Sequence, residues 1–269
     1  MNRNLLLRTA SGVVYVALIV GAIFAGHLIF AALTAIFAAL AVNEFSTIVN
    51  SGSRNRPVAT AVWDIVGAVA LVFSQAVSDS FMIALVGVMV FYFLVRNVLA
   101  LYDHSEHPFR NAAWSATAIV TIALPLALLN TVYGGGAGRN LVLAIFVMIW
   151  LNDTGAYCTG SLLGRHKMFP RVSPKKSWEG FAGGLLFCVA AAVGAWCFGI
   201  QGWNLWQWLV AGVVACAAST YGDLFESLLK RNAGIKDSGN LIPGHGGILD
   251  RIDSLLMVAP AFMLLVLLF

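Results

Sequence analysis

Charged residues are scarce in this chain, and more than half of them fall in two short segments. The chain has 269 residues, of which 16 are Lys or Arg and 12 are Asp or Glu. Residues 165–179 and 222–253 hold 15 of these 28 charges. The first segment is mainly basic and the second contains several carboxylates. Bases that can hold phosphates, together with acids that can gather a metal ion, indicate phosphoryl or nucleotidyl transfer.

Four aspartates are the candidate catalytic residues. Asp153 lies eleven residues before Gly164, which is about 16 Å along a helix. This depth is near the middle of the membrane, where an ionised carboxylate is costly and indicates a functional site. The alternative is a neutral acid that is hydrogen bonded to a neighbouring helix. Asp250 and Asp253 share one face of an opening helical turn, where they suit either helix capping or a divalent cation. Asp223 has no basic partner at helical spacing within its own span.

A polar stripe surrounds Asp223. Its members are spaced so that they fall on one face of a helix, and they are Ser219, Asp223, Glu226, Ser227 and Lys230. Such a stripe in a membrane helix must face the bundle interior or a water-filled cavity. An internal ion pair between Glu226 and Lys230 is the alternative for those two residues. For the basic segment, the alternative is a loop that fixes topology and contacts anionic lipid.

The elements that must position these groups are membrane helices. The chain is 60% hydrophobic and 10% charged, with a mean hydropathy of +0.86, which excludes a soluble domain and a disordered chain. We expect an all-α, polytopic membrane protein forming one integral domain, 1–269, with N-terminal spans in 1–140 and catalytic spans in 141–269. About nine spans are predicted, at 11–26, 28–49, 58–77, 80–101, 112–133, 140–163, 179–199, 204–229 and 250–269. Eight spans is the alternative, because the first is short.

The basic residues predict the orientation. With the N-terminus in the cytoplasm and nine spans, fifteen of the sixteen Lys and Arg residues fall on the cytoplasmic side, and only Arg139 falls outside. This is the distribution that the positive-inside rule requires. No basic tract with interleaved aromatic residues is present, which excludes a nucleic-acid partner.

The second charged segment resembles a known family signature. The run from Ser227 to Asp253, which ends in IPGHGGILDRID, is similar to the signature of the CDP-diacylglycerol synthases, also known as phosphatidate cytidylyltransferases. Residues 152–157 and 173–180 resemble other conserved blocks of that family. Ser161 stands where many members carry a basic residue. The resemblance is strong over 150–253.

The resemblance implies an activity and a site. Members of the family convert CTP and phosphatidic acid to CDP-diacylglycerol and pyrophosphate in the cell membrane, with Mg²⁺, a second cation (K⁺) and a homodimer. It places metal-binding carboxylates at Asp223 and Asp250, with Asp253 beside them, and we add Asp153 as a catalytic candidate. The candidate substrate-binding residues are Asn152, Lys167, Arg171, Ser173, Lys175, Lys176, Lys230, Arg231, His245, Gly246, Gly247 and Arg251.

Two other functions stay open at this point. A CTP-dependent lipid kinase would transfer the γ-phosphate and release CDP. A transporter would use the intramembrane carboxylates as ion-coupling sites, although transporters commonly contain repeated halves and this sequence has no internal repeat.

Overall fold

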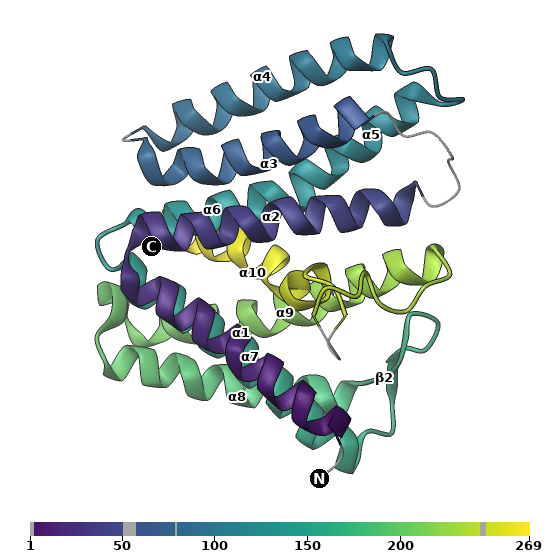
Figure 1. Ribbon diagram of the computed structural model, residues 1–269. Helices are drawn as coiled ribbons and strands as arrows, with labels where there is room; N and C mark the ends of the chain where they lie inside the picture. Colours follow the sequence, from purple (N-terminus) through teal and green to yellow (C-terminus); the bar gives the residue numbers. More distant parts are fainter. Residues whose placement is uncertain (1–2, 51–57, 79, 243–245) are drawn as a thin grey trace. The chain divides into compact units, whose positions relative to one another are not determined.

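The computed structural model describes residues 3–50, 58–78, 80–242 and 246–269 (Figure 1). Nearly all of these residues are helical. In chain order the elements are α1 (Arg3–Ala25), α2 (His27–Val49), α3 (Val58–Val77), α4 (Phe81–Leu101), α5 (Pro108–Ala118), η1 (Ile119–Ala123), α6 (Leu124–Gly134), α7 (Gly138–Leu163), β1 (Lys167–Phe169), β2 (Ser173–Ser177), α8 (Trp178–Cys197), η2 (Ile200–Gly202), α9 (Leu205–Asn232) and α10 (Leu249–Leu268).

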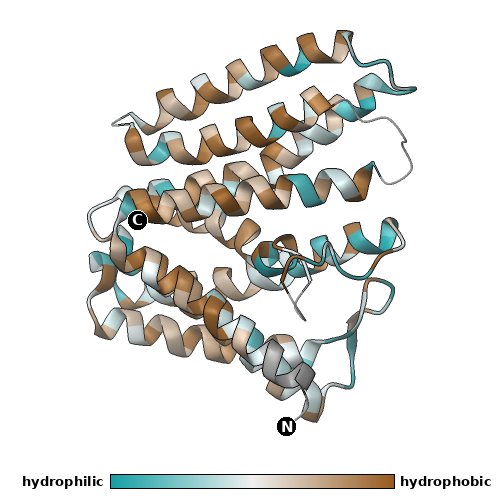
Figure 2. Cartoon of the chain, in the orientation of Figure 1, coloured by the Kyte–Doolittle hydropathy of each residue, from teal (hydrophilic) through white to brown (hydrophobic). Residues whose placement is uncertain are grey.

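The all-α membrane architecture is confirmed. Each of the nine predicted segments is helical, and in the described part of the chain eight helical runs are long and apolar enough to cross a membrane. The remaining segment, α1, contributes a shorter apolar stretch, Thr9–Ala25. It is separate from α2 because Gly26 adopts a φ of +126°, which other residues rarely adopt. Figure 2 shows hydrophobic residues along the helices and hydrophilic residues concentrated in the connecting segments.

One span changes helix type along its length. It runs from Pro108 to Gly134 and combines α5, η1 and α6. Pro108 occupies the first turn, where a missing N–H costs nothing. Within the span, Pro125 has no N–H to donate to the carbonyl of Thr121, and the π-helical turn η1 lies at this point.

The helices form two compact units that are interleaved along the sequence. Unit 1 consists of Met1–Thr131 and Ala233–Arg251, and unit 2 consists of Val132–Asn232 and Ile252–Phe269. In unit 1, α2 packs on α3 and α3 packs on α4; in unit 2, α8 packs on α7 and α9. In unit 2 the backbones of α7 and α8 approach closely, since a Cβ added at Gly155 of α7 would lie 2.7 Å from the carbonyl oxygen of Gly183.

Unit 1 contains a buried polar network between α3, α4 and α5. The carboxylate of Asp64 accepts hydrogen bonds from Tyr92 at 2.7 Å and from Ser115 at 2.6 Å, and it pairs with Arg96 at 3.4 Å. Arg96 is only 2% exposed and lies within α4. The sequence count had placed Arg96 among the cytoplasmic basic residues, but its charge is held inside the helices by Asp64.

Candidate active site

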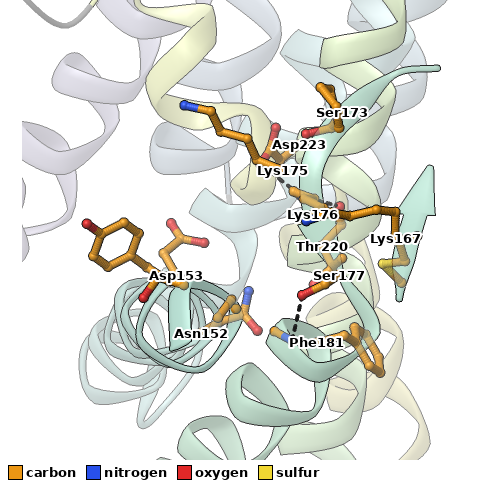
Figure 3. Close-up of a pocket in the computed structure, with 17 residues that line it drawn as sticks. Asn152, Asp153, Lys167, Ser173, Lys175, Lys176, Ser177, Phe181, Thr220 and Asp223 are labelled. Carbon is orange, nitrogen blue, oxygen red and sulfur yellow. Dashed lines mark hydrogen bonds and ion pairs between the residues drawn. The ribbon is translucent and has the colours of Figure 1, made fainter. Parts of the chain in front are cut away.

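A cavity of about 580 Å³ lies in unit 2, between α7, the two strands, α8 and α9 (Figure 3). Its helical walls carry Asn152 and Asp153 from α7 and Asp223 from α9. The strands contribute Lys167, Ser173, Lys175 and Lys176. The structure therefore brings seven of the predicted site residues to one cavity, which has cationic and anionic groups on its walls.

The basic segment forms an antiparallel β-hairpin, whereas its prolines, Pro170 and Pro174, predict only a rigid loop. Strands β1 and β2 pair with Lys167 opposite Ser177. The hairpin is held against α9 by a small apolar cluster in which Met168 and Val172 bury against Leu224. Anchored in this way, β1 places both Lys167 and Met168 on the wall of the cavity.

Two polar contacts fix where the hairpin meets α8. The side chain of Ser177 accepts a hydrogen bond from the backbone N–H of Gly180 at 3.2 Å, which is a standard N-cap. Glu179 accepts hydrogen bonds from the backbone N–H groups of Arg165 and His166, each at 3.2 Å, and lies 2.6 Å from His166 Nδ1. Both ends of the hairpin are thus tied to the first turn of α8, and the backbone that carries the lysines is held in place.

Lys176 and Asp223 form an ion pair on the wall of this cavity. The Nζ of Lys176 lies 2.8 Å from Asp223 Oδ2 and donates to the carbonyl of Thr220 at 3.0 Å. The hydroxyl of Ser227 donates to Asp223 Oδ1 at 3.1 Å. The side chains of Lys176 and Asp223 are 24% and 38% exposed. Their charges are therefore fixed in direction but still accessible to a ligand.

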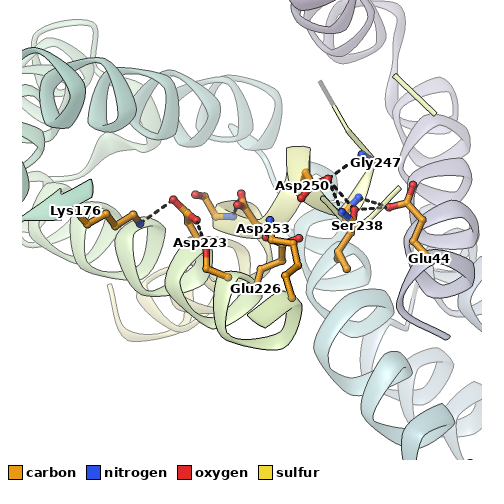
Figure 4. A network of polar contacts seen from close by, with 12 residues as sticks. Glu44, Lys176, Asp223, Glu226, Ser238, Gly247, Asp250 and Asp253 are labelled. Carbon is orange, nitrogen blue, oxygen red and sulfur yellow. Dashed lines mark hydrogen bonds and ion pairs between the residues drawn. The ribbon is translucent and has the colours of Figure 1, made fainter. Parts of the chain in front are cut away.

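Asp223 also belongs to an acidic cluster with Glu226 and Asp253 (Figure 4). One carboxylate oxygen from each residue lies within 4.8 Å of the others. Oxygen donors at this spacing fit a hard divalent cation. Glu226 also forms an ion pair with Lys230 on the next helical turn, as the alternative interpretation of the stripe predicted. The buried Ser219, Glu226, Ser227 and Lys230 confirm that the stripe faces inward.

Asp250 lies in unit 1, where it organises the segment that precedes α10. Its Oδ2 accepts hydrogen bonds from the backbone N–H groups of Ser238 at 2.9 Å and Gly247 at 2.8 Å. Gly246 has a φ of +83°, and a side chain there would lie 2.5 Å from the same oxygen. Gly246 thus leaves room for the Asp250 carboxylate, and Gly247 donates its N–H to it. The predicted His245 lies outside the described residues.

The other predicted binding residues occupy different positions. Arg171, Arg231 and Arg251 are exposed, and none of the three lines the cavity. Lys230 is buried and paired with Glu226. Sequence reasoning missed Thr220, which accepts a hydrogen bond from Lys176, and Glu44 of α2. A carboxylate inside a predicted span was the signal that could have identified Glu44.

Comparisons with known proteins identify the family of this chain. The model of the cytidylyltransferase family matches residues 6–269. The phosphatidate cytidylyltransferase of Staphylococcus haemolyticus is 44% identical over 123 residues, which are 46% of this chain and 47% of the relative. The phosphatidate cytidylyltransferase of Haemophilus influenzae is 44% identical over 129 residues, 46% of this chain and 45% of the relative. These matches span about half the length of the curated relatives. The family match covers nearly the whole chain, and the chain therefore belongs to the cytidylyltransferase family.

Proposed function

We propose that this protein is a phosphatidate cytidylyltransferase that converts CTP and phosphatidic acid to CDP-diacylglycerol and pyrophosphate. One observation carries the proposal: three lysines of a rigid hairpin share a cavity with two carboxylates, in a chain made of membrane helices. Such a cavity suits a triphosphate and a lipid phosphate together. The similarity to two phosphatidate cytidylyltransferases supports the same activity.

The chemistry needs charge neutralisation more than it needs a general base. A phosphate monoester has a second pKa of about 6, so the phosphate of phosphatidic acid is largely ionised at neutral pH and can act as the nucleophile. One of its oxygens forms a bond to the α-phosphorus of CTP while the bond from that phosphorus to the pyrophosphate oxygen breaks. Lys167, Lys175 and Lys176 line the cavity, and their ammonium groups would stabilise the charge on the leaving pyrophosphate.

Lys176 has a second role in this proposal. In the structure its ammonium group neutralises Asp223 at 2.8 Å. The same group lies on the wall of the cavity, where it can contact a phosphate of the nucleotide, and the carboxylate of Asp223 would then be available to hold a cation. The ion pair thus keeps the site electrically balanced before substrate binds.

Cytidylyltransferases generally use a divalent metal, and the donor set here fits one. We propose that Asp223 and Asp253 hold Mg²⁺, with Glu226 beside them. The family resemblance implies that Asp250 is a metal ligand as well. A bound Mg²⁺ would polarise the α-phosphoryl group and offset the charge of the phosphates. The second cation, K⁺, and the homodimer stay predictions of the resemblance.

We also propose that the protein lies in the cell membrane with this site on the cytoplasmic side. The distribution of Lys and Arg residues between the loops supports that orientation. CTP would then enter from the cytoplasm, and the lipid would enter from the bilayer. Asp153, which is exposed on α7 and lines the cavity, stays our fourth candidate for a catalytic carboxylate.

The test is product analysis with purified protein in mixed detergent and phosphatidic acid micelles. We expect pyrophosphate and a CMP-containing lipid from labelled CTP, with loss of activity in EDTA and recovery with Mg²⁺. Release of CDP instead would indicate the lipid kinase, and the absence of any lipid product would favour the transporter. Asp223→Asn should lower kcat by about 10²–10³-fold. Glu106→Gln, which changes an exposed carboxylate in unit 1, should leave kcat unchanged.

A further inference from the structure

Glu44, near the end of α2, contacts a segment that lies about two hundred residues later in the chain. Its Oε1 accepts a hydrogen bond from the backbone N–H of Ile248 at 2.9 Å, and its Oε2 accepts one from Leu249 at 2.9 Å. These are the N–H groups at the beginning of α10, which have no partner within the helix. A carboxylate is favoured at this position because the helix dipole is positive there. Glu44 therefore caps α10 from another helix.

The segment before α10 is shaped around this carboxylate. A side chain at Gly239 would lie 2.9 Å from Glu44 Oε1, and one at Gly247 would lie 2.3 Å from Oε2. Neither glycine has the positive φ that would explain its presence by backbone conformation. Both positions need glycine because Glu44 occupies the space. The contact between Glu44 and the segment before α10 thus depends on residues of both: Glu44 on α2, and Gly239 and Gly247 in the segment.

The same contact reaches Asp250 through Ser238 (Figure 4). The Oγ of Ser238 lies 2.9 Å from Glu44 Oε2 and 2.9 Å from Asp250 Oδ2, and its single proton can be donated to only one of them at a time. The donors that hold Asp250 are Ser238 and Gly247. Glu44 is hydrogen bonded to Ser238 and packed against Gly247, so it helps to fix the position of both.

We propose that Glu44 is a positioning residue for the transfer reaction, acting through the first turn of α10 to orient the Asp250 carboxylate. The expected fall in turnover rests on the proposed function, whereas the expected loosening of the segment before α10 does not. Glu44 caps the helix N-terminus, Ser238 links the two carboxylates, and Asp250 is presented in one orientation. Loss of the cap loosens the segment and lowers turnover, whereas the lysines that line the cavity in unit 2 are not part of this network.

The first variants replace the carboxylate of Glu44. Glu44→Gln keeps the size of the side chain but turns one acceptor into an amide donor that faces N–H or O–H groups. We expect kcat to fall by about tenfold or more, as a displaced site group can cause, with KM for CTP changed less than about threefold. Glu44→Asp keeps the charge with a shorter reach and should recover part of the loss. Asn43→Ala, at an exposed neighbouring position on α2, is the control and should match the wild type.

A second readout does not depend on activity. Lys236 is exposed in the same segment, so limited trypsin digestion in detergent, without nucleotide or metal, reports how tightly the segment is held. Cleavage after Lys236 should be faster in Glu44→Gln than in Asn43→Ala or the wild type. If Glu44→Gln does not fold, Ser238→Ala, which removes only the shared hydroxyl, replaces it in both measurements.

The outcomes separate the two proposals. An inactive wild type would refute the proposed function, and the digestion would still test the cap. An active wild type with unchanged kcat and unchanged cleavage in Glu44→Gln would overturn the positioning role. A rise in KM for CTP with unchanged kcat would also overturn it, because that result would make Glu44 part of nucleotide binding.

Discussion

The crossing of α9 and α10 at Gly222 allows a sharp prediction, because two backbones meet there beside two of the carboxylates. A Cβ added at Gly222 would lie 2.7 Å from the carbonyl oxygen of Asp253 and 3.0 Å from the Cα of Ser254. The first distance is about 0.7 Å short of ordinary contact, and backbone atoms cannot rotate away as a flexible side chain can. In Gly222→Ala, α10 must therefore move relative to α9.

The size of the effect follows from this overlap. Overpacking of this kind costs about 1–3 kcal/mol. In a chain of this size, each kcal/mol lowers Tm by about 2–4 °C, so we expect a fall of about 2–12 °C. The shift also displaces Asp253, which follows the contact directly, relative to Asp223. Because a misplacement approaching 1 Å can cost up to about 10²-fold, kcat should fall by about tenfold or more.

The assay compares Gly222→Ala with a matched glycine in the same unit. Gly194 lies within α8, and a Cβ there would meet nothing within 4 Å. Alanine is a better helix former than glycine by about 0.5–1 kcal/mol, so Gly194→Ala should keep or slightly raise Tm. Both are measured by thermal unfolding in detergent and by CTP-dependent product formation. If Gly222→Ala keeps the Tm and kcat of the wild type, the close crossing and its link to the acidic cluster are refuted.

Three further predictions follow from individual contacts. Lys176→Met should raise KM for CTP several-fold more than Lys175→Met, because Lys176 is the lysine that pairs with Asp223. Equal KM values for the two variants would argue against the dual role of Lys176. Asp64→Ala leaves Arg96 buried without its anion and should cost about 3–5 kcal/mol, and Asp64→Leu combined with Arg96→Leu should restore much of the lost Tm. Burial would raise the pKa of Asp103, but hydrogen bonds from Asn111 and Ser105 outweigh it and hold the pKa below the ordinary 3.8. The ionised form therefore adds stability above about pH 4, which is lost as pH falls further. The Tm of Asp103→Asn should depend less on pH between 3 and 5, and an unchanged slope would contradict this.

The helices were predictable because hydropathy alone determines which segments can cross a membrane. The break between α1 and α2 was predictable from Gly26 and His27, and the inward face of α9 from the spacing of its polar residues. Six of the seven predicted residues in the cavity lie on elements that are neighbours in sequence, α7 and the hairpin, and the seventh, Asp223, lies on α9.

Other features depend on contacts that a linear pattern does not show. The hairpin looked like a rigid loop, since its pairing depends on Met168 and Val172 packing against α9. The burial of Arg96 depends on Asp64, 32 positions earlier on a different helix. Glu44 was missed because its partners are separated from it by 204 and 205 residues, and the apolar sequence around it gives no indication of which segment it binds.

The distance in sequence between Glu44 and α10 has a consequence for how the protein is made. At about 5–20 residues per second, the ribosome needs about 10–40 s to synthesise the 204 residues between Glu44 and its first partner. During this time α2 is already inserted, and its carboxylate must remain near water or lipid headgroups. Unit 1 can be completed only after all of unit 2 except its last helix has emerged. Any chain released early, through truncation or a stalled ribosome, therefore has Glu44 without the N–H groups of Ile248 and Leu249 that it binds in the finished protein.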